Sequence, residues 1–183
     1  MALFSWTLAL SAQTPADRPA GLETDWDIAV TIKEIGAHAD RLLPMLEKIN
    51  VSAWVEKGAS DTYLAQLQSS KVQARSLSES AKMVAATPQK LSADLELYLR
   101  LNALEAMLNS LQEGIRKYEG VNNAMALAIV QAENGANREK FQRYILELAT
   151  QRERDLEVMD HEAQRCRAIV TQATPKPVTQ RKK

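Results

Sequence analysis

Residues 97–118 read LYLRLNALEAMLNSLQEGIRKY, and this stretch decides the fold. Its large apolar residues recur at alternating steps of four and three: Leu97, Leu101, Leu104, Leu108, Leu111, Ile115 and Tyr118. With 3.6 residues per turn, such positions fall on one side of a helix and form a broad apolar stripe that partner helices must cover. The stretch therefore predicts a helix inside a helical bundle, and it carries no catalytic motif.

Two other stretches, residues 28–49 and 63–84, repeat the same period over a similar length. Small residues dominate the middle of the second stretch, so we expect this helix to approach its neighbour closely. Thr87 is expected to cap the next helix and Pro88 to occupy its first position, a tight link that makes the neighbours antiparallel. We therefore predict an all-α fold, an antiparallel up-down four-helix bundle over residues 23–172.

The fourth helix is predicted to be overlong. It is expected to run from residue 123 to residue 172, about 50 residues or ~75 Å, against ~45 Å for the third helix. The pair Asn134-Gly135 is its likeliest break, because a glycine inside a helix costs about 1 kcal/mol relative to alanine. The apolar stripe keeps its phase across this pair, however, so we expect one continuous helix.

Beyond Arg152 this helix is expected to extend past the bundle as a coiled-coil-like segment. The segment is densely charged, yet it keeps an apolar line that we call the C-terminal stripe: Leu156, Met159, Ala163, Cys166 and Val170. Heptad spacing specifies an apolar contact but not the identity of the partner. Two interpretations stay open: the stripe binds a second copy or another protein, or the helix folds back and the stripe belongs to the core.

The ends of the chain predict export. Residues 1–13 read MALFSWTLALSAQ, an apolar run closed by small residues, as in a secretory signal peptide over residues 1–12. No Lys or Arg precedes the run, so either the signal starts further upstream or the segment is something else, and the run is too short for a stable membrane span. Residues 13–22 are expected to form a flexible leader and residues 173–183 a disordered basic tail. The predicted location is therefore periplasmic or secreted.

Composition excludes several classes of function. Lys plus Arg and Asp plus Glu both number 23, so the 183-residue chain has no net charge with which to attract nucleic acid.

Cys166 is the only cysteine, which leaves no internal disulfide and no thiolate metal cluster. It is most simply a small buried hydrophobe, and the alternative is an intermolecular disulfide across a parallel dimer. No motif for a metal, a cofactor or a catalytic group is complete, so we expect neither an enzyme nor a bound cofactor.

One polar constellation remains. In an up-down bundle, seven polar residues from three of the predicted helices are expected at a similar height along the bundle axis. We call them the polar layer: Glu34, His38, Asn102, Glu105, Glu133, Asn134 and Asn137. Glu34 and His38 are four residues apart, as two ligands on one helix face would be, so a ligand- or metal-binding bundle is the alternative function. Asparagine at such positions more commonly fixes register, however. We therefore expect an exported structural or interaction protein that uses its C-terminal helix to form a homo-oligomer or to bind a protein partner.

Overall fold

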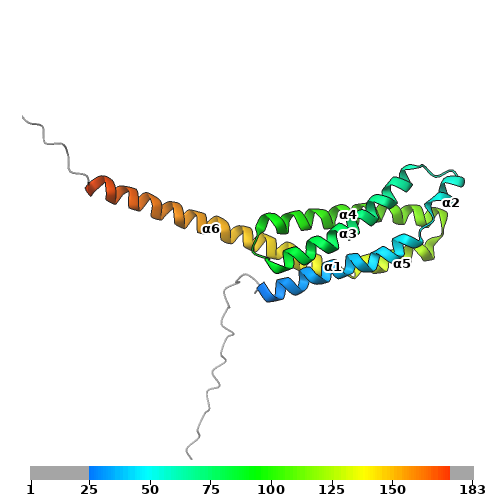
Figure 1. Cartoon of the computed structure of the whole chain (residues 1–183), viewed down its shortest axis with the longest axis horizontal. Coiled ribbons are helices and arrows are strands. Elements are labelled where there is room, and N and C mark those ends of the chain that lie inside the picture. Colours follow the sequence, from blue (N-terminus) through cyan, green and yellow to red (C-terminus); the bar gives the residue numbers. More distant parts are fainter. Residues whose placement is uncertain (1–24, 174–183) are drawn as a thin grey trace, which may run out of the picture.

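The computed structural model describes residues 25–173, and every regular element in this range is a helix. The prediction of an all-helical fold is confirmed. Figure 1 shows the helices as a bundle from which one long helix extends. The six helices are α1 (Asp25–Lys48), α2 (Val51–Glu56), α3 (Thr62–Ala86), α4 (Leu91–Tyr118), α5 (Val121–Ala132) and α6 (Gly135–Ala173).

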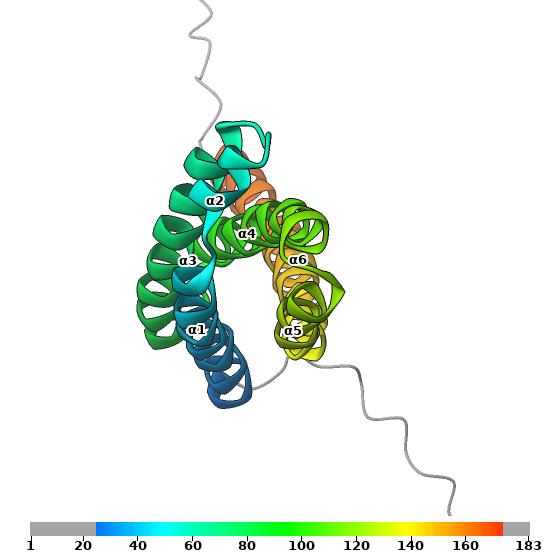
Figure 2. The same cartoon turned by 90° about the vertical axis from the view of Figure 1, so that its right-hand side faces the viewer.

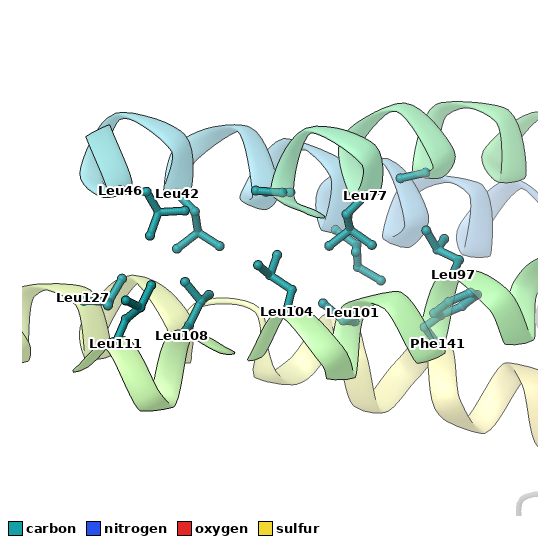
Figure 3. Packing of buried hydrophobic residues seen from close by; sticks show 14 of the residues in the cluster. Leu42, Leu46, Leu77, Leu97, Leu101, Leu104, Leu108, Leu111, Leu127 and Phe141 are labelled. Atoms are coloured by element: carbon teal, nitrogen blue, oxygen red, sulfur yellow. The ribbon is translucent and has the colours of Figure 1, made fainter. Parts of the chain in front are cut away.

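The long helices surround one apolar core. Helix α1 packs against α3 and α6, and α4 packs against α3, α5 and α6. Figure 2 shows α1 and α3 side by side, with α4 next to α3 and with α5 and α6 on the other side of α4. In Figure 3 leucines from α1, α3, α4 and α5 point toward one another together with Phe141 of α6. The leucines that define the stripe of α4 are buried there, as their spacing predicts.

Helices α1 and α3 meet at small residues. A Cβ atom placed on Gly36 of α1 would lie 2.9 Å from the Cβ of Ala81 on α3 and 3.4 Å from the carbonyl oxygen of Ser78. The close approach predicted from the small residues of α3 is therefore confirmed. On α1 the crossing is formed by Gly36, because the close packing leaves no room for a side chain there.

An aromatic cluster closes the end of the bundle where α2 lies. Trp54 of α2 is buried, stacks on Tyr118 at 5.7 Å between ring centroids and meets Tyr63 edge-on at 5.6 Å. Its indole Nε1–H donates to Oε1 of Glu119 at 2.9 Å. The ring fits because position 114 is a glycine, where a Cβ atom would lie 2.7 Å from the Trp54 ring.

The start of α4 differs from the prediction. The helix begins at Leu91 rather than at Pro88, and Thr87 follows the end of α3 instead of capping α4. A tertiary contact lies at this link: the hydroxyl of buried Tyr144 on α6 donates to the carbonyl oxygen of Pro88 at 2.6 Å. This bond holds Pro88 in the link between the two helices.

The prediction of one continuous fourth helix is wrong. Helix α5 ends at Ala132, residues Glu133 and Asn134 form a turn, and α6 begins at Gly135. The break lies at the pair that the sequence marks as the likeliest one. In a continuous helix the Asn134 N–H would bond the carbonyl of Val130, but here it donates to the carbonyl of Gln131 at 3.3 Å.

Some sequence predictions lie outside the described residues. They are the signal peptide of residues 1–12, the leader of residues 13–22, and residues 174–183 of the basic tail. Within residues 25–173, the helices that the structure describes include none that combines the length and the apolar character needed to cross a membrane.

Candidate functional site

The C-terminal stripe lies on the part of α6 that extends beyond the other helices (Figure 1). Phe141, Tyr144, Ile145 and Leu148 of α6 are buried in the core, whereas from Arg152 to Thr171 the side chains are exposed except for the half-buried Asp155 and Ala163. The large members of the stripe are mostly exposed: Leu156 is 64%, Met159 67% and Val170 65% accessible. The Cys166 thiol is free and exposed. In this structure the stripe is therefore not core of its own chain.

The break between α5 and α6 is tied to His38 of α1. The Val130 carbonyl oxygen lacks the N–H of Asn134 that a continuous helix would supply and accepts from the Glu133 N–H at 3.3 Å, and Nε2 of buried His38 lies 2.7 Å from the same oxygen. A carbonyl oxygen only accepts hydrogen bonds, so Nε2 carries the proton and the neutral ring leaves Nδ1 unprotonated. Burial lowers the pKa of His38 below its usual value of 6.5, which keeps the ring neutral.

Two groups beside this contact are buried without a protein partner. They are Nδ1 of His38 and the side-chain amide of Asn134, whose nitrogen and oxygen both lack a hydrogen bond to another residue. Asn134 is 1% accessible and occupies the turn between α5 and α6. Such groups weaken the folded state unless they are satisfied, because each loses its hydration on burial.

The rest of the polar layer does not converge on a single point. Glu34 and Glu133 are exposed, and Asn102, Glu105 and Asn137 are half-buried. The two paired acids bond to arginines outside the set: Glu105 to Arg138 at 2.5 Å and Glu133 to Arg41 at 3.6 Å. Glu34 and His38 both lie on α1, but His38 is buried whereas Glu34 is exposed. Among residues 25–173 no three His, Cys, Asp or Glu side chains are grouped so that they could hold a metal ion.

Asp94 is an unusual residue that the sequence analysis missed. It lies in the first turn of α4, is fully buried, and neither carboxyl oxygen has a hydrogen-bond partner. Burial raises its pKa from 3.8 to about 7. The sequence did contain a sign of this burial, because one further step of three residues back along the stripe from Leu97 leads to Asp94.

Helix α5 adds a second apolar surface. Its 12 residues contain no charged side chain, and Val121, Met125 and Ile129 are exposed on the face away from buried Leu127. On the side toward α1, a partly open groove of about 350 Å³ lies between α1, α4 and α5. Its lining is mixed: Met45, Lys48, Ile49, Ile115, Glu119, Asn123, Ala126 and Leu127.

Comparison of the chain with protein-family models, with curated proteins and with solved structures finds no match.

Proposed function

We propose that this chain is an exported structural or interaction protein that assembles with a second copy, or binds a protein partner, through the C-terminal stripe of α6. The observation that carries the proposal is the exposure of the stripe. Leu156, Met159 and Val170 keep heptad spacing along a helix that extends beyond the core, and each of them is about two-thirds accessible. A solvated helix gains nothing from such a line, whereas a two-helix contact requires it.

The size of the stripe sets the strength of the contact. Burying a Leu, Met or Val side chain contributes about 1.5–3 kcal/mol, so three such residues from each of two helices contribute roughly 9–18 kcal/mol. Association costs about 4–15 kcal/mol in lost freedom of movement. The midpoints of these two ranges leave a surplus of about 4 kcal/mol, which corresponds to a dissociation constant of about a millimolar. We therefore expect an assembly that depends on protein concentration.

The proposed architecture is an antiparallel up-down four-helix bundle, with α5 and α6 together as the fourth member. In support, α1 contacts α3 and α6, α4 contacts α3 and α5, and the links between successive helices are short. The ion pair between Arg41 and Glu133 offers a test. Cysteines at these two positions in a Cys166→Ser chain should be joined within one molecule by a short bifunctional thiol reagent.

Export to the periplasm or the medium remains part of the proposal, and it rests on the pattern of residues 1–13. The mass of the protein recovered from the envelope or the medium of a bacterial host tests it, because export predicts loss of about 12 residues.

We further propose that the protein is not an enzyme and does not bind nucleic acid. The balanced charge of the chain supports the second point, and the burial of His38 and Asp94 away from the groove beside α5 supports the first.

Solution mass tests the interaction. We would measure it by light scattering over about a hundredfold range of concentration, for the full chain and for the chain cut after Arg152. The cut removes no core residue, since the last buried side chain of α6 is Leu148. We expect the full chain to form a dimer or larger assembly as concentration rises, and the cut chain to remain a folded monomer.

A matched pair of variants refines this test. Leu156→Glu places a charge on the stripe, whereas Val158→Glu places one at 63% accessibility on the opposite side of the same helix. Each position has an arginine four residues before it and an acid four residues after it, so the two new charges meet similar neighbours. Only Leu156→Glu should reduce assembly. If the native chain stays monomeric, it does not self-assemble through the stripe. If it assembles and both variants behave alike, the stripe is not the interface.

A second candidate is ligand binding at the polar layer. It is favoured by the buried, unpartnered atoms of His38 and Asn134. This function predicts that the cut chain and the full chain have the same mass, and that zinc or haem raises the melting temperature, because a ligand that binds only the folded state stabilises it. Loss of the zinc or haem effect in His38→Leu would place the ligand at this layer.

A further inference from the structure

We infer that the occupant of the C-terminal stripe is a second copy of this chain, bound antiparallel, with its two-fold axis crossing α6 at the level of His161. This inference rests on the proposed function and adds the partner, the orientation and the register. Three features carry it: the direction in which the stripe faces, the space that the bundle already fills, and the sizes of the stripe residues.

The stripe continues the buried face of α6. Met159, Ala163 and Cys166 each follow a core residue of the same helix, Phe141, Ile145 and Leu148 respectively, by 18 residues. Eighteen residues are about five turns at 3.6 residues per turn, so each pair faces the same way. Helix α6 is unbroken over these positions. A helix bound to the stripe must therefore lie on the side of α6 that α1 and α4 cover within the bundle.

This position excludes a parallel pair in register. In such a pair the partner helix would continue past Arg152 along the buried face of the first α6, where α1 and α4 already pack. The bundle ends at this level, since Arg152 contacts the carbonyl of Gln89 in the link before α4. In an antiparallel pair the partner helix instead arrives with its C-terminal end, and its own bundle begins at the tip of the first α6, where Arg152 of one copy lies opposite Val170 of the other.

The sizes of the stripe residues set the register. If Met159 faces Ala163 of the second copy, Leu156 faces Cys166 and Arg152 faces Val170. Every contact of the two inner layers then joins a large side chain to a small one, which fills the space between the helices evenly. A parallel pair in register would instead place Ala163 opposite Ala163 and leave a gap, which costs stability.

Flanking charges do not alter this choice. The antiparallel register joins Glu153 to Arg167 twice and places Asp160 and Glu162 each near its own counterpart. A parallel pair joins Glu162 to Arg167 twice and opposes Asp155 to Asp160 twice. Opposite and like pairs are equal in number in both cases, so apolar packing decides the orientation.

Cys166 reports the orientation directly. In the antiparallel register the two Cys166 residues lie ten helix positions apart, about 15 Å along the axis. A disulfide needs Cα atoms about 4.4–6.8 Å apart, so Cys166 cannot bridge the dimer without disrupting it. A parallel pair would bring the two thiols face to face.

The test is oxidative crosslinking of the full chain, with the solution mass measured in parallel. We expect the native chain to dimerise without a Cys166–Cys166 disulfide, and Leu156→Cys to yield a covalent dimer whose peptide map joins position 156 to Cys166. Val158→Cys, on the opposite side of the helix, should not crosslink. Because Leu156→Cys could weaken the dimer, a nitroxide label on Cys166 of the native chain provides a second reading. Two labels about 15 Å or more apart are expected, whereas labels in contact indicate a parallel pair.

The outcomes separate this inference from the proposed function. A chain that is monomeric at all concentrations refutes self-assembly, and with it the inference. A dimer that forms the Cys166–Cys166 disulfide, or whose labels touch, is parallel: the interaction then stands and the orientation is overturned. The stripe register is overturned if the chain dimerises but Leu156→Cys forms no disulfide, either with Cys166 or with a second Leu156→Cys, and the nitroxide labels lie much further apart than about 15 Å.

Discussion

Asp94 gives the sharpest test of the folded core. Its carboxyl group is fully buried without a hydrogen-bond partner, and its pKa rises from 3.8 to about 7. The folded chain therefore keeps a proton that the unfolded chain has lost between these two pH values. By linkage, stability falls as the pH rises from about 4 to about 7 and levels off above that. The two pKa values correspond to at most about 4 kcal/mol, at 1.36 kcal/mol for each pH unit between them.

Asp94→Asn replaces the acid by a neutral group of similar size, so the variant should lack this dependence. Its buried amide also lacks partners, but that cost is the same at every pH. We expect the variant to gain on the native chain by about 3 kcal/mol between about pH 4.5 and pH 7.5, because part of the full difference already lies below pH 4.5. Urea unfolding followed by circular dichroism, at one fixed protein concentration, measures the difference at each pH.

The matched control is Asp40→Asn, on the exposed face of α1. Subtracting the native curve removes the pH dependence of all other groups, so the comparison isolates one carboxyl. If the difference between Asp94→Asn and the native chain changes by less than about 0.5 kcal/mol over this range, Asp94 is ionised in the folded state and the argument from burial fails.

Three further substitutions test the contacts described above, each by urea unfolding. His38→Leu should cost about 1–3 kcal/mol near neutral pH, because the Val130 carbonyl loses one of its two hydrogen-bond donors. Because burial lowers the pKa of His38, protonation below about pH 6.5 favours the unfolded native chain, so the difference in stability between the native chain and the variant should shrink as the pH falls. Gly36→Ala should destabilise the folded chain by about 1–3 kcal/mol, because its Cβ would lie 2.9 Å from the Cβ of Ala81. Gly135→Ala, whose Cβ would have no atom within 4 Å, should stabilise the folded chain by about 0.5–1 kcal/mol. Equal effects of the two substitutions would refute a tight crossing of α1 and α3. Trp54→Ala should cost about 3–5 kcal/mol and Trp54→Phe less, and a cost of Trp54→Ala below about 1 kcal/mol would mean that the aromatic cluster does not close the bundle.

Apolar periodicity alone was enough to predict most of the helices. Alternating steps of four and three between Leu97 and Ile115 identify the buried side of α4, because helix geometry places such residues on one face whatever surrounds them. The same spacing picked out the C-terminal stripe. It could not tell whether the stripe is core, since core and interface obey one pattern.

Tertiary contacts decided what the pattern left open. The stripe holds its phase from α5 into α6, yet the helix breaks there, and the Val130 carbonyl bonds His38, 92 positions away in the sequence. The start of α4 moved from Pro88 to Leu91 where Tyr144 bonds the Pro88 carbonyl. Both corrections involve a backbone carbonyl bonded by a distant side chain, a choice that no local propensity records.

The sequence by itself therefore determined the helical fold, the buried face of each long helix and the apolar line on α6. The tertiary structure decided where the fourth helix breaks, that Asp94 is buried, and that the C-terminal stripe is exposed rather than internal. The division has a physical reason. Periodicity is a property of one helix, whereas burial depends on how far its neighbours extend, and α1 and α4 do not extend along α6 beyond Arg152.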